Sequence, residues 1–245
     1  MNNSIIRVEN LRLQHGTTLI QKDLNFSINR KEVFTIMGPS GCGKSTVLKA
    51  LTGFLPPVNG QVFIEDKLLW NHGIADSSLK KNFAVLFQNS ALWSYMTIEE
   101  NISLPLQRFT KLSKAMIAKI VKYKLSLVNL AGYESYYPYE LSGGMQRRAA
   151  LARALALDPE ILFFDEPHAG LDPVTIRNLD ELIVSIKDNL GTTIVLVTHE
   201  ISSIKRISDN ILFLDNVKKT LLELGSIDVL MKSKYNKVQE FLNAG

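Results

Sequence analysis

GPSGCGKST at residues 38–46 decides how the rest of the chain is interpreted, because it fits the pattern G-x-x-x-x-G-K-[S/T]. A strand-like run, EVFTIM at 32–37, precedes it, and a helical pattern begins at Lys44. In this context the glycines let backbone N–H groups turn inward around an anion, and the start of the helix adds partial positive charge. The stretch therefore predicts a phosphate-binding loop; the alternative is a glycine-rich turn that only opens a helix. The residues that would form the loop are Gly38, Pro39, Ser40, Gly41, Cys42, Gly43, Lys44, Ser45 and Thr46.

Three side chains of this loop have a chemistry of their own. Lys44 would reach the β- and γ-phosphates of ATP, and the Ser45 hydroxyl would ligate Mg²⁺. Cys42 is the single cysteine of the chain and has two interpretations. It is either a small residue in a permissive position or a thiol whose pKa is lowered at a helix N-terminus, and which is therefore sensitive to oxidation.

Two carboxylates follow a second strand-like run, ILFF at 161–164. A strand buried on both faces delivers the residues after it to the carboxyl edge of the sheet, where α/β proteins bind their ligands. There Asp165 would hold Mg²⁺, directly or through water, and Glu166 would act as the general base that polarises the attacking water. The pair could instead form an ordinary strand exit, but the phosphate loop favours the catalytic interpretation.

Polar residues also end two other strand-like runs. His199 ends TIVLVTH at 193–199, and we expect it to act with Glu166 in catalysis by contacting the γ-phosphate; a polar cap on a core strand is the alternative. Gln88 follows FAVLF at 83–87 and would ligate Mg²⁺ or sense the γ-phosphate. The expected metal ligands are therefore Ser45, Gln88 and Asp165.

The composition excludes several classes of protein. With 245 residues, 46% apolar and 21% charged, the chain is too apolar for intrinsic disorder. It has no apolar run of the roughly 18 residues that span a bilayer, and no secretory signal. A single cysteine excludes a disulfide framework and a zinc cluster. We expect a soluble, cytoplasmic domain, and the net charge of +4 favours neither nucleic acid nor membrane.

The order of the elements predicts an α/β fold in one unit of 1–245. Strand-like and helical runs alternate, which is typical of a parallel sheet with crossover helices. Three β-rich pieces at 5–14, 17–28 and 32–37 predict an N-terminal antiparallel layer, and TLLELG at 220–225 predicts a final edge strand. Residues 98–157 are helical in pattern. We expect a core of about 1–88 and 158–245, with a helical subdomain of about 89–157 inserted in it.

One further motif gives a family resemblance. LSGGMQRR at 141–148 opens the helical run AALARALAL, with Ser142 as a candidate N-cap and two glycines that leave the first backbone N–H groups bare. A phosphate loop, LSGGMQ, DEP at 165–167 and a histidine at a strand end together resemble the ATP-binding-cassette ATPases over essentially the whole chain. The resemblance implies a P-loop NTPase core, ATP hydrolysis with Mg²⁺, and a transporter as the larger assembly.

The resemblance also implies a homodimer with two ATP molecules between the subunits. In that family the signature of one subunit closes on the γ-phosphate held by the other, which assigns Ser142, Gly143 and Gly144 to ATP across the interface. Asp172 in AGLDP corresponds to the loop that crosses the interface. His15 stands where the family usually has an aromatic residue that stacks on adenine, so it is either a weaker, titratable stacking partner or an exposed turn residue.

Three branches of the family compete. FQNSALWSYMTIEENISLPL at 87–106, the segment 142–175 and VTHEISSIKRISDNILFL at 197–214 resemble the Mla-type phospholipid transport ATPases, which work with a permease and an Mce-domain protein. An amino-acid-type importer of small solutes is the alternative. A soluble cassette protein that acts on ribosomes or DNA is a remote one, and we expect no nucleic-acid partner.

Two surface features bear on an integral permease as partner. Leu92, Trp93, Tyr95 and Met96 crowd the segment after Gln88, either as a docking groove or as part of the helical core. Residues 101–133 hold no acid but six bases, which form either a solvated face or a surface toward anionic headgroups or an acidic partner. The expected location is therefore cytoplasmic, peripheral on the inner face of the cell membrane. The six bases are Arg108, Lys111, Lys114, Lys119, Lys122 and Lys124.

Overall fold

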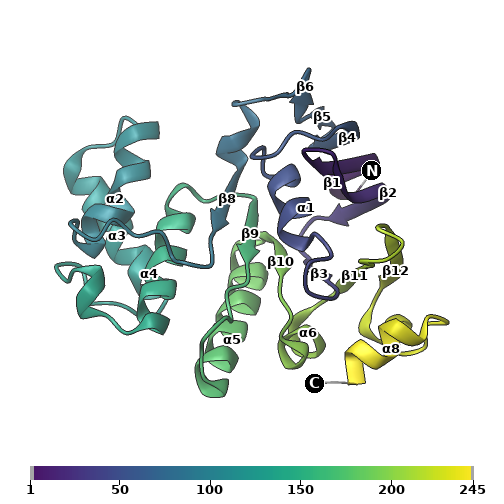
Figure 1. Cartoon of the computed structure of the whole chain (residues 1–245). Helices are drawn as coiled ribbons and strands as arrows, with labels where there is room; N and C mark the ends of the chain where they lie inside the picture. Colours follow the sequence, from purple (N-terminus) through teal and green to yellow (C-terminus); the bar gives the residue numbers. More distant parts are fainter. Residues whose placement is uncertain (1–2, 244–245) are drawn as a thin grey trace.

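A six-stranded sheet forms the centre of the molecule in the computed structural model, which describes residues 3–243 (Figure 1). The strands β3 and β10 lie side by side in its middle, and every residue of both is buried, so helices or strands cover both faces. In order across the sheet the strands are β12 (Leu221–Gly225), β11 (Asn210–Leu214), β3 (Val33–Met37), β10 (Thr193–Val197), β9 (Ile161–Asp165) and β8 (Phe83–Leu86). The edge strand β12 runs antiparallel to β11, and the remaining neighbours are parallel.

A second, antiparallel sheet packs against this one. It has the order β2-β1-β4-β5, and β2 alternates buried and exposed residues as expected for a sheet with one face on a core. The prediction for 32–37 is wrong in one respect: this piece is β3 of the parallel sheet, because all of its side chains are buried between two layers. The strands are β1 (Ser4–His15), β2 (Thr18–Asn29), β4 (Asn59–Ile64) and β5 (Lys67–Leu68), with a separate hairpin of β6 (Trp70–Asn71) and β7 (Ile74–Ala75).

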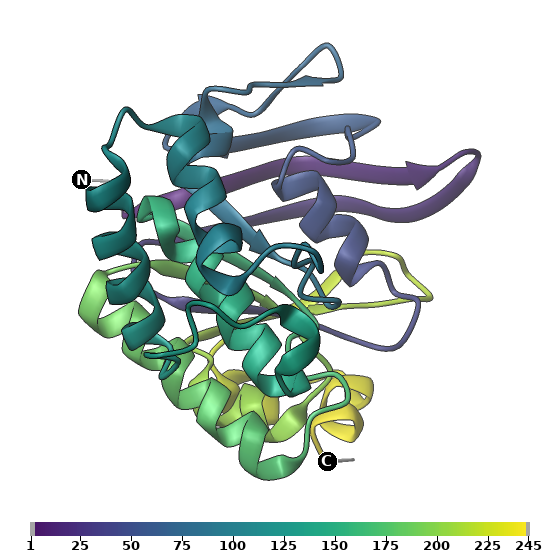
Figure 2. The ribbon, with the colours of Figure 1, turned by 90° about the vertical axis from the view of Figure 1, so that its left-hand side faces the viewer.

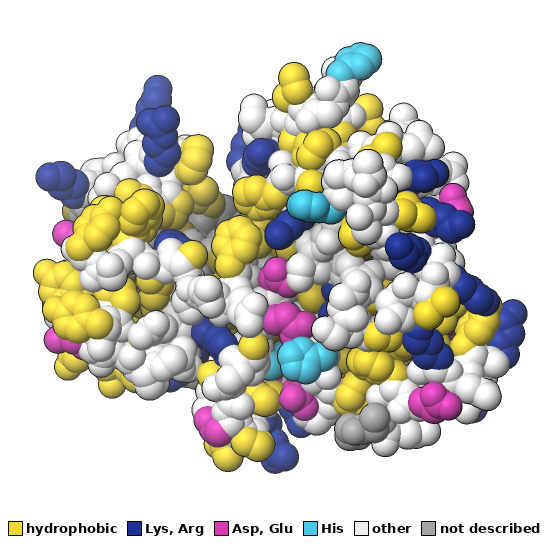
Figure 3. Space-filling view, in the orientation of Figure 1, with side chains coloured by type: hydrophobic (Ala, Val, Ile, Leu, Met, Phe, Trp, Pro, Cys, Tyr) yellow, Lys and Arg dark blue, Asp and Glu magenta, His cyan; other side chains and the backbone are white. Residues whose placement is uncertain are grey.

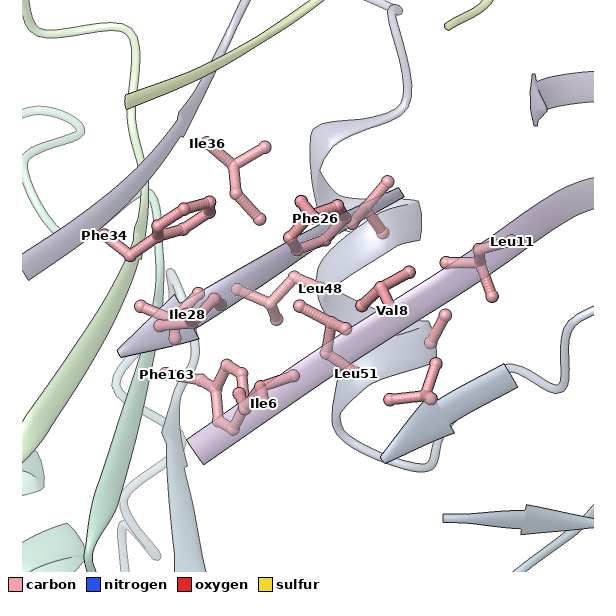
Figure 4. Close-up of a cluster of buried hydrophobic side chains, with 14 of the residues drawn as sticks. Ile6, Val8, Leu11, Phe26, Ile28, Phe34, Ile36, Leu48, Leu51 and Phe163 are labelled. Atoms are coloured by element: carbon pink, nitrogen blue, oxygen red, sulfur yellow. The ribbon is translucent and has the colours of Figure 1, made fainter. Parts of the chain in front are cut away.

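The helix α1 (Lys44–Leu51) lies between the two sheets. Figure 4 shows Leu48 and Leu51 of α1 near Ile6 and Val8 of β1, in one cluster with Phe34 and Phe163 of the parallel sheet. Leu51 is fully buried and Leu48 is 1% exposed. Because the phosphate loop is the segment between β3 and α1, this packing fixes both of its ends.

Helices cover the opposite face of the parallel sheet. Alternate residues of β9 divide between the faces: Ile161 and Phe163 join the cluster around α1, whereas Leu162 and Phe164 join a cluster of helical residues. Three helices form a lobe beyond β8, and two follow β9 and β10 (Figures 1 and 2). They are α2 (Ile98–Phe109), α3 (Lys114–Leu127) and α4 (Gly143–Ala154) in the lobe, then α5 (Pro173–Leu190) and α6 (Ile201–Ile207).

The C-terminal segment packs on the outer strands. Val238 and Leu242 are fully buried against residues of β11. Its helices are α7 (Ile227–Met231) and α8 (Asn236–Asn243), and short 3-10 helices lie at Leu79–Asn82, Pro138–Glu140 and Leu155–Leu157. Among residues 3–243, none of the helices is long and apolar enough to cross a membrane. The α/β architecture with an antiparallel layer and inserted helices is confirmed.

Candidate functional site

The phosphate loop leaves β3 at Met37 and enters α1 at Lys44. Its glycines are required by close contacts: a Cβ on Gly38 would lie 2.4 Å from the carbonyl oxygen of Leu214, and one on Gly43 would lie 2.5 Å from Cγ2 of Ile20. Gly43 also has φ 100°, a conformation that side chains resist. The Lys44 ammonium donates to the carbonyl oxygens of Gly38 (2.9 Å) and Pro39 (3.3 Å), so it lies over the loop.

Open space and hard oxygen donors fit this loop to a Mg²⁺-bound triphosphate. A Cβ on Gly41 would meet no atom within 4 Å, so a ligand can approach the loop there. The Ser45 hydroxyl donates to Oδ1 of Asp165 at 2.9 Å, which brings the two predicted metal ligands together. Within the described part of the chain, no group of three or more His, Cys, Asp or Glu could hold a metal. Mg²⁺ suits such a site because it binds one or two protein oxygens together with substrate phosphates and water.

Glu166 follows Asp165 at the end of β9 in an uncommon backbone conformation, with φ 51°. Its backbone N–H donates to the carbonyl of Val197 at 2.8 Å, which ties the turn to the neighbouring strand. Its Oε2 is buried and accepts no hydrogen bond from the described residues, although Nδ1 of His199 lies 2.8 Å away, because the approach is poorly aligned. The carboxylate therefore keeps an oxygen that can accept a hydrogen bond from a water, as a general base requires.

His199 and Gln88 occupy the same edge of the sheet. The side chain of His199 is 65% exposed beside Glu166, so a ligand can reach it. Gln88 is exposed two residues after β8, whose Leu86 pairs with Phe164, the residue before Asp165. Topology therefore gathers Gln88, Asp165 and His199 along one edge, with the phosphate loop following β3 beside β10.

The loop after Gln88 is strained, and side chains that sequence reasoning missed hold it. Ser90 and Ala91 both have φ 49°, a left-handed conformation in a loop without glycine. Arg153 of α4 donates to the carbonyl oxygens of both residues, at 3.1 and 2.7 Å. Burial lowers the pKa of Arg153. In the sequence this arginine resembled an ordinary helical position of AALARALAL, because its partners lie 62 and 63 residues away.

Asn101, also missed, organises the apolar segment that continues this loop. It is fully buried; its Oδ1 accepts from the Trp93 N–H at 2.8 Å, and its Nδ2 faces the carbonyls of residues 93, 96 and 97 at 3.0–3.1 Å. Trp93 (48% exposed) and Tyr95 (69%) form an edge-to-face pair with centroids 5.6 Å apart. Leu92 instead packs on the helical core. The exposed pair Trp93 and Tyr95 therefore fits the interpretation as a docking surface, whereas Leu92 fits the interpretation as part of the helical core.

The signature residues begin α4 on another part of the surface. Ser142 is the N-cap, as predicted: its Oγ accepts from the Met145 N–H at 3.3 Å. Gly143 has open space where a Cβ would stand, and one on Gly144 would lie 2.9 Å from Cγ2 of Thr175. A hollow of about 730 Å³ opens over these glycines, and no phosphate-loop residue lines it. A ligand in the phosphate loop therefore lies outside this hollow of the same chain.

Asp172 closes the loop between Glu166 and α5. It is the N-cap of α5: its Oδ1 accepts from the N–H groups of Val174 and Thr175, both at 3.0 Å, and its Oδ2 from the Thr175 hydroxyl at 2.5 Å. The hydroxyl of Thr175, followed by these N–H groups, lowers the pKa of Asp172. Asp172 also lines the hollow over the signature.

The two remaining predicted residues lie at opposite extremes of exposure. His15 is exposed where β1 turns into β2, which leaves both interpretations of this residue open. Cys42 is 1% exposed, and burial raises the pKa of its thiol, with Lys44 acting in the opposite direction. The hypothesis of a thiol with a lowered pKa is therefore wrong, since desolvation outweighs the nearby charge and the helix start.

Gln21 is a third residue that sequence reasoning missed. It is fully buried on β2, and its amide donates to the carbonyl oxygens of Cys42 (2.6 Å) and Asp215 (2.9 Å). It thereby links the phosphate loop to the end of β11. A glutamine within an alternating strand carries no signal of such a role, because its partners are backbone atoms 21 and 194 residues away.

Comparison with known proteins identifies relatives over nearly the whole chain. The model of the family described as "ABC transporter" matches residues 21–169. The "Probable ribonucleotide transport ATP-binding protein mkl" of Mycobacterium tuberculosis is 40% identical over 239 residues, which is 97% of this chain but 66% of that protein. The chain thus spans just under two thirds of that relative's length. The "Intermembrane phospholipid transport system ATP-binding protein MlaF" of Haemophilus influenzae is 35% identical over 99% of this chain and 91% of its own.

Solved structures have the same architecture. CbiO1 from Clostridium perfringens, described as part of the ABC transporter complex CbiONQ, gives a TM-score of 0.86 at 27% identity and covers 99% of this chain and 96% of its own. The dimeric structure of MJ0796, a bacterial ABC transporter cassette, gives a TM-score of 0.78 at 29% identity over 91% of this chain and 98% of its own.

Proposed function

Because the chain belongs to the ABC transporter family, we propose that it is the ATP-hydrolysing subunit of a transporter that moves phospholipid between membranes. The family binds ATP with Mg²⁺ as a general property. The observation that carries the proposal is the Ser45–Asp165 contact at the mouth of a phosphate loop, beside a Glu166 whose buried Oε2 is unsatisfied.

The residues of the phosphate loop would bind the triphosphate. Backbone N–H groups and the start of α1 would surround the phosphates, while Lys44 would exchange its two loop carbonyls for phosphate oxygens. Ser45, Asp165 and Gln88 would hold Mg²⁺, which supplies charge neutralisation on the phosphates when it is bound. The remaining loop residues, Gly38 to Gly43 and Thr46, shape this cradle.

Hydrolysis would depend on positioning and on one general base. Glu166 would accept a hydrogen bond from the attacking water at its unsatisfied Oε2 and aim that water at the γ-phosphate. His199, 2.8 Å from the same oxygen, would contact the γ-phosphate and fix the geometry. Little covalent chemistry is required, because phosphoryl transfer depends mainly on alignment and on charge stabilisation.

A homodimer would complete two such sites. The hollow over Ser142, Gly143 and Gly144 includes Asp172 but no residue of the phosphate loop, so these residues would reach ATP held by a second copy. The dimeric cassette among the structural relatives supports this arrangement. His15 would lie at the adenine end of each site.

An integral permease would dock on the side that bears a groove between the sheet and the helical lobe. The groove has a volume of about 460 Å³ and is mainly apolar, with Leu104 and Phe109 of α2 facing Phe83 of β8 and Lys80 and Arg108 beside them. Figure 3 shows a deep notch between the lobe and the rest of the molecule, with hydrophobic side chains on its walls. A cytoplasmic helix of the permease, with acids toward these bases, fits it. We propose that the helical subdomain of about 89–157 moves with that helix when ATP closes the dimer.

The basic residues of 101–133 would lie beside that permease, at the inner face of the cell membrane. Lys124 does not belong to this surface: it is 1% exposed and forms an ion pair with Asp158 at 2.5 Å. The other five bases are exposed. Exposed apolar side chains lie between them, among which Phe109 is 70% and Met116 46% exposed. Bases interspersed with apolar groups suit anionic headgroups.

Phospholipid is the proposed cargo because MlaF matches this chain over 91% of its own length. The mycobacterial relative is named for ribonucleotide transport and extends well beyond the matched region, so nucleotide cargo is a competing possibility. An importer of the amino-acid type and a soluble cassette protein are the two competing functions outside lipid and nucleotide transport. If the cargo is phospholipid, the expected partners are the permease and an Mce-domain lipid-binding protein.

An affinity purification tests this proposal. Tagged Glu166→Gln is isolated from detergent-solubilised membranes with ATP and Mg²⁺, and mass spectrometry identifies the bound proteins and lipids, with Lys44→Ala as the matched control. Recovery of a permease, an Mce-domain protein and phospholipid, absent from the control, supports the proposal. A small-solute permease with its binding protein, or a soluble complex alone, contradicts the phospholipid assignment.

A further inference from the structure

His168 lies in the loop after Glu166, and its ring is almost completely buried, at 4% exposure. Its Nδ1 is 3.1 Å from Oγ1 of Thr198, and its Nε2 is 2.9 Å from Oδ1 of Asp180 on α5. Asp180 is fully buried and forms an ion pair through Oδ2 with Arg206 on α6. None of these groups takes part in the hydrolysis proposed above, although the chain of contacts ends beside His199.

For a neutral imidazole, the chemistry of the two partners sets the direction of each hydrogen bond. The Asp180 carboxylate is an acceptor, so Nε2 of His168 carries the ring proton and donates it. Nδ1 then accepts from the Thr198 hydroxyl. The Thr198 Oγ1 in turn accepts from the backbone N–H of Glu200 at 3.1 Å. Both ring nitrogens of His168 therefore have a partner, and His168, Thr198 and Asp180 are all buried, where an unpaired polar group would be costly.

The hydrogen bond from the Glu200 N–H to Thr198 Oγ1 spans His199. The Thr198 side chain bonds to the N–H two residues later, which closes a tight turn with His199 at its centre. The turn is also joined to the Glu166 loop at the C-terminal end of β10, where the Glu166 N–H donates to the carbonyl of Val197. His168 supplies the second link between the same two segments, through Thr198.

We propose that His168 is a positioning residue that holds His199 and Glu166 in register through Thr198. The inference rests on the proposed function, since it concerns the same hydrolytic site. The two links together fix the loop of residues 166–168 against the turn of residues 198–200, and the Asp180–Arg206 pair anchors His168 from the opposite side. If the link to Thr198 is lost, His199 and the water held by Glu166 lose their relative placement, while the phosphate loop is untouched.

Two substitutions of His168 separate the effects of its two hydrogen bonds, because each keeps one and removes the other. The shorter side chain of His168→Asn places an amide oxygen near the position of Nδ1, so it retains an acceptor for Thr198 and loses Asp180. His168→Gln reaches the position of Nε2, so it retains a donor to Asp180 and loses Thr198. Because Asp180 is the fully buried charge, His168→Gln is expected to be the more stable variant. Activity is expected in the opposite order.

The kinetic experiment measures steady-state ATP hydrolysis and thermal unfolding of the full chain in parallel. His168→Gln is expected to lower kcat roughly tenfold to a hundredfold, with KM for ATP within about twofold, because a small misplacement of reacting groups has such effects. His168→Asn is expected to retain most of kcat despite a lower Tm. Thr198→Val should reproduce His168→Gln, whereas Thr198→Ser should not. If kcat follows Tm across the four variants, His168 is a purely structural residue and the inference is wrong.

A second measurement does not depend on turnover. The chain has four histidines, so ¹⁵N-labelled imidazole spectra resolve each ring. The expected pattern for His168 is protonation at Nε2, and the His199 signals should shift in His168→Gln but not in His168→Asn. A His168 ring protonated at Nδ1, or His199 signals that are identical in both variants, overturns the inference. If the wild-type protein hydrolyses no ATP while the spectra behave as expected, the proposed function fails and the positioning link stands.

Discussion

Replacing Asn101 with leucine tests whether a single buried amide holds the segment of residues 93–97 that follows Gln88. The substitution keeps the side-chain volume similar but removes the hydrogen bonds that Asn101 makes with backbone groups at residues 93, 96 and 97. Leu fits the apolar surroundings at the start of α2, where Ile98 and Ile102 are fully buried. The expected loss therefore comes from the hydrogen bonds and not from packing.

The magnitude follows from what becomes unpaired. A hydrogen bond contributes about 0.5–1.5 kcal/mol, and a buried group left without a partner costs about 1–3 kcal/mol. Two of the carbonyls that Asn101 releases keep backbone partners, because Trp93 O accepts from the Met96 N–H at 3.2 Å and Thr97 O from the N–H of residue 101 at 2.9 Å. The Trp93 N–H and the Met96 carbonyl lose their partner, which gives a destabilisation of about 2–4 kcal/mol. In a domain of this size each kcal/mol lowers Tm by about 2–4 °C, so a decrease of roughly 5–15 °C is expected.

Thermal and urea unfolding of Asn101→Leu measure this directly, and Thr97→Ala is the matched control. Thr97 caps the same helix through a capping box with Glu100, and its loss costs about 1 kcal/mol. The backbone carbonyl that Asn101 contacts at this position is retained in the control. If Asn101→Leu is no less stable than Thr97→Ala, the amide does not hold the loop, and the reasoning is refuted.

Three further changes have defined outcomes. Lys44→Ala should weaken ATP binding at least tenfold by fluorescent-nucleotide titration, since the ammonium lies over the loop. Unchanged affinity would show that this loop does not bind the phosphates of ATP. Cys42 should react slowly with a thiol reagent in the native protein, with a rate that is still rising above the usual thiol pKa, because burial raises the pKa and only the thiolate reacts; rapid labelling at neutral pH would contradict the burial. Charge reversal at Lys111 and Lys119 should reduce flotation with vesicles of anionic lipid at low salt, and equal flotation of wild type and variant would exclude a role for these bases.

The sequence predicted the local structure around the candidate site best where it depends on neighbouring residues. The phosphate loop, the two acids after β9 and the N-cap at Ser142 are each specified by neighbouring residues, and the structure has the loop, the strand and the cap where they were expected. Buried parallel strands could be recognised because ILFF and TIVLV are apolar on both faces. The parallel pairing of β9 with β10 then brings Asp165 and His199 to the same edge.

Other features depend on partners far away in the chain and could not be predicted from local pattern. Asn101, Gln21 and His168 are polar residues whose buried surroundings form only when the chain folds. Of the two interpretations of Cys42, the thiol with a lowered pKa is wrong, because the burial that raises the pKa comes from the sheets that enclose α1. Lys124 was expected on an exposed basic surface, but its ammonium reaches Asp158, which is 34 residues away.

The most direct test of the account is the mass of Glu166→Gln in solution with and without ATP. Glu166 would orient the water, and the phosphate loop would still bind ATP, so the variant should retain two nucleotides between two subunits and be a stable dimer by light scattering when Mg²⁺-ATP is present. Lys44→Ala under the same conditions should remain a monomer. A Glu166→Gln protein that stays monomeric at saturating ATP, even with its permease, would contradict the proposal that this chain closes on ATP as a dimer to drive transport.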